Sequence, residues 1–222
     1  MGQSIVFLVL ITPKITIPVG FAFFLPDPVL SAWRKEDEKL KKKGIPKTQR
    51  PVEPKRNENY PTIPEIALKM LEQFKKNYPD IKIKCIFADA LYGTEKFLDG
   101  ASKIFGGIQV ISQIRYNQNV RFRNKDISVE KYFTSYPGTE QVMKVRGGKE
   151  IKVIVGSARL HVCSHGKKRF VIALKYEGEE EYRYIVASHL SWRTMDIVEA
   201  YSLRWLAEVF LKTGREMKVG VS

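Results

Sequence analysis

Strand-like and helix-like patterns alternate between residues 64 and 114, and this alternation constrains the fold more than any other feature. Residues 81–88 pass from alternating to continuous apolar character, as a strand does when it enters a core. Helical patterns flank this run at 64–77 and 94–105, and residues 108–114 form another strand pattern. Together with the apolar start of the chain, this order predicts an α/β domain with parallel strand pairing.

Two apolar runs open the chain, at residues 5–12 and 15–25. Their content of Ile, Val and Phe predicts adjacent strands of a sheet that is covered on both faces. Pro18 and Gly20 indicate an edge or a bulge in the second strand. Pro13 interrupts the apolar character after too few residues to span a bilayer, so no membrane span or membrane partner is expected.

The charge of the chain favours a polyanionic partner. The 38 Lys and Arg against 24 Asp and Glu give a formal net charge of +14, and neutralising nucleic-acid phosphates releases condensed counterions. Acidic membrane surfaces are the competing interpretation. The two cysteines, Cys85 and Cys163, exclude a disulfide framework, which predicts a reducing, cytoplasmic location.

Residues 34–62 differ from the rest in composition and are predicted as a basic flexible loop. Residues 34–58 hold ten Lys and Arg and five Asp and Glu, and Pro46, Pro51 and Pro54 argue against a long helix. A solvated loop is favoured over the alternative, a basic arm that lies on DNA phosphates.

Residues 116–186 are predicted as a β-rich insertion sub-domain. They hold short alternating segments separated by turn signals such as Pro137-Gly138 and Gly147-Gly148. The insertion would divide an α/β core into a first part, residues 1–115, and a second part, residues 187–222. The second part contains the longest helical pattern of the chain, at 194–218.

Two carboxylates are candidate catalytic residues because of their positions in the predicted elements. Asp89 follows the apolar strand at 81–88, and sites gather at the carboxyl ends of strands in open α/β sheets. Glu208 lies within the C-terminal helical pattern. At about 100° per residue, one helix face with an arc of roughly 60° carries Tyr201, Arg204, Glu208 and Arg215. A metal-bound carboxylate beside guanidiniums suits an enzyme that cuts phosphodiesters, whereas an ordinary Arg204–Glu208 ion pair is the structural alternative.

These residues resemble the signature of the insertion-sequence-four class of DDE transposases. That signature has the spacing Y-(2)-R-(3)-E-(6)-K, which this chain matches at Tyr201, Arg204 and Glu208. Arg215 stands where the family has Lys, which keeps the charge and changes the donor geometry. The stretch 87–94, FADALYGT, is similar to the motif of the family's second aspartate.

The resemblance implies an RNase H-like mixed sheet with flanking helices, interrupted by an antiparallel β insertion. It implies that Asp89 and Glu208 are catalytic and bind Mg²⁺ or Mn²⁺, and that Tyr201, Arg204 and Arg215 bind DNA. The reaction would be DNA transposition, in which two divalent ions support cutting and joining of phosphodiester bonds at the transposon ends. The partners would be double-stranded DNA, from transposon ends and target, and a second copy in a homodimer of the intact protein.

The first catalytic aspartate of the family has no counterpart here. No acidic residue precedes Asp27, which follows the second apolar run in Leu25-Pro26-Asp27-Pro28 and is a poor substitute. The first core strand is therefore expected to be missing, and a truncated transposase fragment without activity of its own is the leading hypothesis. The alternative is a non-catalytic DNA-binding or regulatory remnant.

A zinc site is a third hypothesis. His161, Cys163 and His165 alternate, so in a strand all three would point to one face. A closed tetrahedral zinc site needs a further ligand from elsewhere, and Gly166 suggests that His165 already lies in a turn. A structural role for these residues is therefore favoured.

Overall fold

The computed structural model describes residues 4–12, 14–145, 147–207 and 209, which form a mixed α/β fold. The elements follow in this order: β1 Ser4–Ile11, β2 Thr16–Phe24, α1 Pro28–Lys42, η1 Lys47–Gln49, α2 Ile63–Asn77, β3 Cys85–Ala88, η2 Ala90–Tyr92, α3 Glu95–Ile104, β4 Gln109–Ile114, β5 Asn119–Phe122, β6 Lys125–Ser128, α4 Val129–Ser135, β7 Thr139–Lys144, β8 Glu150–Val162, η3 Cys163–His165, β9 Lys167–Tyr176, β10 Arg183–Ala187 and α5 Thr194–Ser202. The strand and helix patterns between residues 64 and 114 are confirmed, although β3 is shorter than its apolar run.

Strands β1 and β2 form an antiparallel hairpin that makes a two-stranded sheet of its own. A bulge lies between Leu8 and Val9, opposite Pro18–Gly20, so the irregularity indicated by Pro18 and Gly20 is confirmed. Helix α2 packs across the hairpin. Coverage on both faces was the wrong expectation, because five large apolar side chains of the two strands remain exposed: Ile5, Phe7, Ile17, Phe21 and Phe23.

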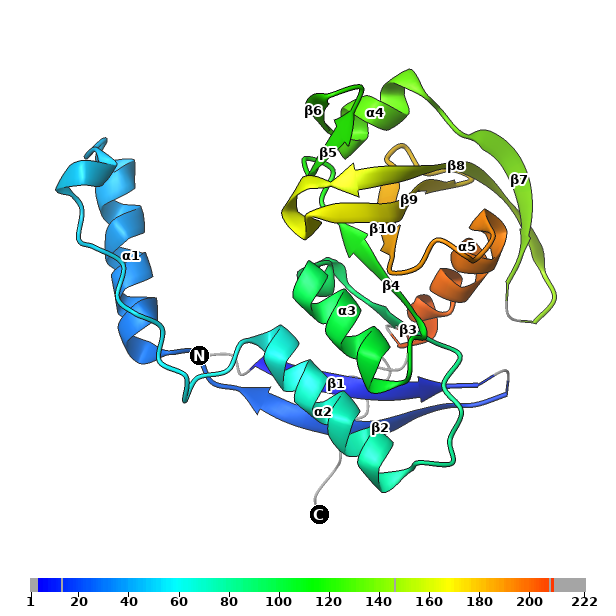
Figure 1. Cartoon of the computed structure of the whole chain (residues 1–222), viewed down its shortest axis with the longest axis horizontal. Helices are drawn as coiled ribbons and strands as arrows, with labels where there is room; N and C mark the ends of the chain where they lie inside the picture. Colours follow the sequence, from blue (N-terminus) through cyan, green and yellow to red (C-terminus); the bar gives the residue numbers. More distant parts are fainter. Residues whose placement is uncertain (1–3, 13, 146, 208, 210–222) are drawn as a thin grey trace, which may run out of the picture.

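The main sheet has eight strands in the order β3-β4-β10-β9-β8-β5-β6, with β7 paired to β8 (Figure 1). The pairing of β3 with β4 is parallel, and the other strand pairings that the structure describes are antiparallel. Strands β8 and β9 and most of β10 fall within residues 116–186, which were predicted as the β-rich insertion. They continue the sheet of β3 and β4, because β10 pairs with β4 along Tyr184–Ala187 and Ile111–Ile114.

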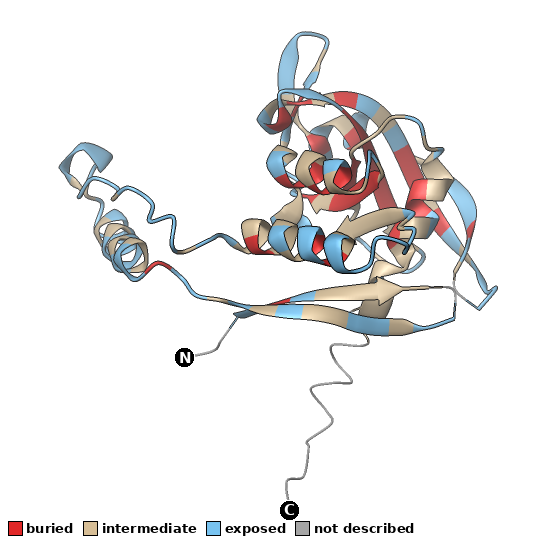
Figure 2. Ribbon diagram, turned by 60° about the horizontal axis from the view of Figure 1, so that its bottom comes forward, coloured by how far each residue is buried: buried red, intermediate tan, exposed pale blue. Residues whose placement is uncertain are grey.

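Each face of the main sheet carries its own hydrophobic core, and strand alternation decides which core a residue joins. In β9, Val171 and Ala173 pack in the core under α2, α3 and α4, whereas Ile172 and Leu174 pack in the core under α5. A strand that is buried on both faces has a continuous apolar sequence, and residues 170–174 accordingly contain no polar residue. Figure 2 shows the buried residues gathered in this sheet and the helices against it.

Helix α1 occupies part of the segment that was expected to be a loop. Residues 34–42 belong to this helix. Only the later part of the 34–62 segment lacks a long helix or strand. The expectation was wrong because the prolines at 46, 51 and 54 all follow the helix end. Asp27 caps the helix: its carboxylate accepts from the amides of Val29 and Leu30 at 2.9 and 3.2 Å. The helix extends away from the main sheet (Figure 1).

Helix α5 lies against the face of the sheet opposite α3, with Ile197 and Val198 fully buried in the second core. Residues 204–207 are again helical. Within the part of the chain that the structure describes, no helix combines the length and apolar character needed to cross a membrane.

Candidate functional site

Asp89 follows the carboxyl end of β3, as the sequence predicted, and begins a short turn that includes η2. Its side chain is 62% exposed. The turn is closed by the amide of Tyr92, which donates to the Asp89 carbonyl at 2.9 Å. The same carbonyl accepts from the Ser112 hydroxyl of β4 at 2.7 Å. These backbone contacts hold the carboxylate at the sheet edge while leaving it accessible.

The far end of this turn is anchored by a buried histidine. The Nε2–H of His165 donates to the Gly93 carbonyl at 3.0 Å, since its Nδ1 accepts from Arg169 Nε at 3.3 Å. Burial lowers the pKa of His165, which favours the neutral ring that this pattern requires. The 89–93 turn is therefore fastened both to β4 and to the loop between β8 and β9.

Tyr201 and Arg204 approach the turn from α5 and the helical residues after it. Arg204 forms an ion pair with the Asp89 carboxylate, and its side chain is 18% exposed. Its guanidinium lies 5.4 Å from the centre of the Tyr201 ring. Tyr201 is buried in the second core, and this burial raises the pKa of its hydroxyl to about 12. The phenol is therefore a neutral hydrogen-bonding group at physiological pH.

Three of the five predicted site residues meet in space, namely Asp89, Tyr201 and Arg204. Glu208 and Arg215 lie outside the described residues, so their predicted roles stay predictions. No group of three or more potential metal ligands occurs among residues 4–207 as far as they are described. Asp89 belongs to no such group, and one carboxylate does not by itself fit a pair of divalent ions.

The zinc hypothesis finds no support in the described geometry. His161 belongs to β8, whereas Cys163 and His165 lie in the 3-10 turn η3, so the strand alternation ends before it could align all three. His165 is used in the hydrogen bonds that anchor Gly93. Asp27, the poor candidate for a first catalytic carboxylate, is nearly buried as the cap of α1 and also accepts from the Asn57 amide at 3.3 Å.

Sequence reasoning missed a neighbouring pair of side chains. A pocket of about 450 Å³ beside Arg204 is lined in part by Tyr176 and Arg183. The Arg183 guanidinium lies 4.9 Å from the Tyr176 ring centre and pairs with Glu179. The strand pairing of β9 with β10 brings Arg183 and Tyr176 together at the ends of the two strands. The signal in the sequence was the charged Arg183 at the start of an otherwise apolar strand.

No family model matches the chain. A comparison with curated proteins also found no match. The geometry of the site therefore carries the functional argument.

Proposed function

We propose that this chain is a catalytic-core fragment of a DDE transposase of the insertion-sequence-four class, which binds double-stranded DNA and does not cut it alone. One observation carries the proposal: Asp89 and Arg204, 115 residues apart in sequence, form an ion pair at the end of β3. Tyr201 lies one helical turn before Arg204 and under its guanidinium. This juxtaposition unites the aspartate motif and the Tyr-Arg motif of the resemblance.

The mixed sheet with helices on both faces is compatible with an RNase H-like core. Glu208 follows Arg204 by four residues in the sequence. On a continuous helix the two side chains would therefore lie on the same face. A divalent ion held by Asp89 and Glu208 would supply Lewis-acid activation of water or of a 3′-hydroxyl. Because the described residues form no group of three or more potential metal ligands, we derive no cleavage step through such an ion.

The guanidinium of Arg204 suits a DNA phosphate. Its planar donors can bind a phosphate oxygen pair, and the Tyr201 ring beneath it limits its orientation. Without a phosphate at this position, the Asp89 carboxylate forms an ion pair with the Arg204 guanidinium. Binding of a phosphate at Arg204 would therefore free the Asp89 carboxylate to bind a divalent metal ion. This exchange would couple DNA binding to metal binding at one site.

A non-catalytic DNA-binding remnant is the second candidate. It is favoured by the same ion pair, because a carboxylate neutralised by Arg204 is not poised to hold a metal. The two candidates share DNA binding at Arg204 and differ in whether Asp89 contributes through a divalent ion.

Arg204→Ala tests the shared claim. We expect the affinity for a short fluorescein-labelled DNA duplex to fall about tenfold, since a charge-assisted hydrogen bond to phosphate is lost. Fluorescence anisotropy at constant salt measures the affinity. Arg121→Ala is the matched control, because Arg121 also pairs with an aspartate but lies on β5 at the far end of the sheet. Equal losses in both variants would indicate general charge attraction and contradict the proposed site.

Asp89→Asn separates the two candidates. In a core fragment, Mn²⁺ strengthens DNA binding by the wild-type chain, and this effect disappears in Asp89→Asn. In a non-catalytic remnant, Mn²⁺ has the same effect on both proteins. Neither protein is expected to nick supercoiled plasmid in Mg²⁺, and nicking that survives Asp89→Asn would refute the assignment of Asp89.

A further inference from the structure

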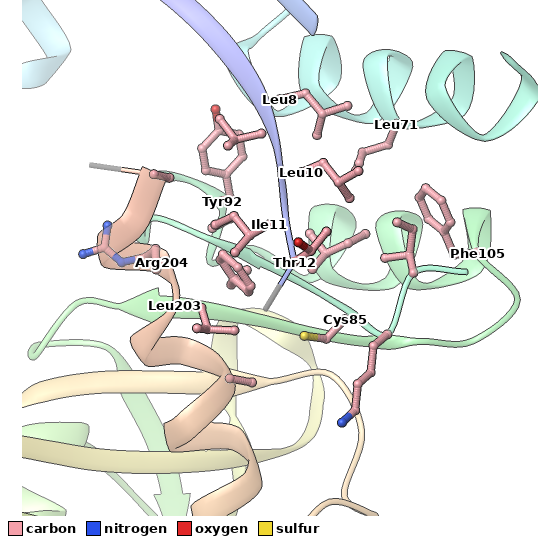
Figure 3. Close-up of a pocket in the computed structure, with 18 of the residues that line it drawn as sticks. Leu8, Leu10, Ile11, Thr12, Leu71, Cys85, Tyr92, Phe105, Leu203 and Arg204 are labelled. Atoms are coloured by element: carbon pink, nitrogen blue, oxygen red, sulfur yellow. The ribbon is translucent and has the colours of Figure 1, made fainter. Parts of the chain in front are cut away.

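The apolar groove between β1 and β3 has an explanation within the proposed fold. Its volume is about 1460 Å³, and Figure 3 shows Leu8 and Leu10 of β1 near Leu71 of α2, with Cys85 of β3 lower in the groove. Under the proposed fold, this is the place of the first core strand, whose absence the resemblance implies. The groove therefore indicates no further partner, in contrast to the surface of helix α1.

Residues 28–57 form an arm that stands away from the main sheet (Figure 1, Figure 2). The arm consists of helix α1 and of a return segment, residues 43–57, which runs back alongside the helix. No residue of the arm belongs to either hydrophobic core of the described residues, and α1 contains no buried residue. The arm therefore offers its surface to solvent or to a partner rather than to the rest of the chain.

Contacts along the arm hold the return segment against α1. The Trp33 indole Nε1–H donates to the Pro51 carbonyl at 2.9 Å. Arg50 pairs with Asp37 at 2.8 Å, and the two side chains are 13% and 26% exposed. At the base of the arm, the carboxylate that caps α1 also accepts from the Asn57 amide at 3.3 Å. The arm is therefore a braced projection that holds its outer side chains in place for a partner.

The face of α1 that is turned away from the return segment carries three lysines. At about 100° per residue, Lys35, Lys39 and Lys42 fall within an arc of roughly 60°. Trp33 and Asp37, which contact the return segment, lie on the opposite side of the helix. All three lysines are exposed, and we refer to them as the lysine stripe.

Positive charge prevails along the arm. Residues 28–57 hold ten Lys and Arg against four Asp and Glu, in a chain whose net charge is +14. Asp37 is engaged by Arg50 on the face opposite the stripe. Glu38 pairs with Lys42 at 3.0 Å, but these two side chains are 66% and 75% exposed, so solvent screens the pair. The stripe therefore keeps its positive charge available to a polyanion.

A nucleic-acid backbone is the partner that this surface fits. Ammonium groups held on a helix neutralise phosphates and release their condensed counterions. A second copy of the chain is disfavoured, because each copy carries a net charge of +14. A membrane surface is also disfavoured, because Trp33 and Leu40 lie on the side of the return segment and the stripe includes no large apolar residue to insert.

We propose that the lysine stripe of α1 is a second DNA contact, which binds backbone phosphates of the duplex beyond those near Arg204. This inference rests on the proposed DNA binding and adds the place where further phosphate contacts are made. Fifteen residues give α1 a length of about 22 Å, so the arm extends the contact along the duplex. Because the stripe consists of lysines that meet phosphates, it positions the DNA without reading its sequence.

Replacement of the stripe in the full chain tests the proposal. The stripe variant carries Lys35→Gln, Lys39→Gln and Lys42→Gln, and the probe is a fluorescein-labelled duplex of about 30 base pairs, which is longer than the arm. We expect the affinity to fall about tenfold at constant salt. The log–log salt slope is expected to lose about 2 to 3 units, since each lost phosphate contact contributes about 0.9. Fluorescence anisotropy over a series of NaCl concentrations measures both.

The matched control removes the same charge from the body of the protein. It replaces three exposed lysines of helices α2 and α3, as Lys69→Gln, Lys76→Gln and Lys103→Gln. The control is expected to lose about twofold in affinity or less. Equal losses in the control and the stripe variant would assign the effect to overall charge and overturn the proposal. Unchanged DNA affinity of the stripe variant, with a loss of binding to phosphatidylserine vesicles or without one, would overturn it as well.

Lysine acetylation, quantified by mass spectrometry, locates the contact. Bound duplex is expected to slow acetylation of the stripe more than acetylation of the three control lysines. The same comparison in Arg204→Ala separates the two proposals. A protected stripe, together with an unchanged affinity after Arg204→Ala, would support the arm and refute the site at Arg204. A loss of affinity after Arg204→Ala without protection of the stripe would support that site and refute the arm.

Discussion

At the scale of single residues, two arginines with acidic partners differ sharply in their surroundings. The side chain of Arg169 is 2% exposed; it pairs with Asp99 at 2.8 Å and donates to the Ser188 carbonyl at 3.1 Å. Arg193 pairs with Asp196 at the same distance of 2.8 Å, but its side chain is 86% exposed. Burial, and not the length of the ion pair, determines what each contributes to stability.

Replacement of Arg169 by Ala is expected to destabilise the fold by about 3 kcal/mol, because it leaves the Ser188 carbonyl and His165 without their buried partner. Arg193→Ala, the exposed control, is expected to cost less than about 1 kcal/mol. Urea denaturation followed by circular dichroism gives both free energies. Similar costs for the two variants would contradict the structural role of Arg169.

The pair of Asp89 and Arg204 lies between these extremes, since Asp89 is largely exposed and Arg204 is not. Its contribution to stability is accordingly small, and its position at a strand end is what makes it a candidate for function. Sequence reasoning could select both residues from their motifs. It could not show that Arg204 pairs with Asp89, because this contact joins elements 115 residues apart.

At the scale of elements, the turn after β3 depends on close backbone approach. A Cβ added at Gly93 would overlap the carbonyl oxygen of Gln113 in β4, and this oxygen belongs to the main chain. The glycine therefore allows the turn that carries Asp89 to lie directly on the neighbouring strand.

Gly93→Ala is expected to destabilise the protein by about 2 kcal/mol, because backbone must shift to relieve the overlap. The control is Gly20→Ala in β2, where the nearest atom to the added Cβ is the flexible end of Met70 at 3.4 Å. Its effect is expected to stay within about 1 kcal/mol in either direction. Thermal unfolding compares the two variants, and a tolerated Gly93→Ala would show that the turn does not need this approach.

At the scale of the whole molecule, the charge of +14 gives a long-range attraction to polyanions. This electrostatic attraction promotes the encounter of the protein with any DNA, whereas Arg204 provides one defined contact. Affinity for duplex DNA is expected to fall with salt along a log–log slope of about −4 or steeper, since several phosphates are neutralised at once.

The Arg204→Ala variant is expected to reduce the magnitude of this slope by about 1, the effect of one lost phosphate contact. Anisotropy titrations over a series of NaCl concentrations measure both slopes. A wild-type slope near zero would contradict the idea that phosphate contacts dominate, and an unchanged slope in the variant would place Arg204 away from the DNA.

The amino-acid sequence by itself determined the local elements of this protein. Helix α2, strand β4 and the strand-end position of Asp89 all follow from periodicity and turn residues within short windows. Helix α1 was missed because residues 34–62 were taken as one segment, although the helix ends within it at Lys42. Only the tertiary structure decided that β10 pairs with β4, that Arg204 meets Asp89, and that a groove separates β1 from β3. Such pairings join distant segments, and local preferences do not specify which strand edges meet.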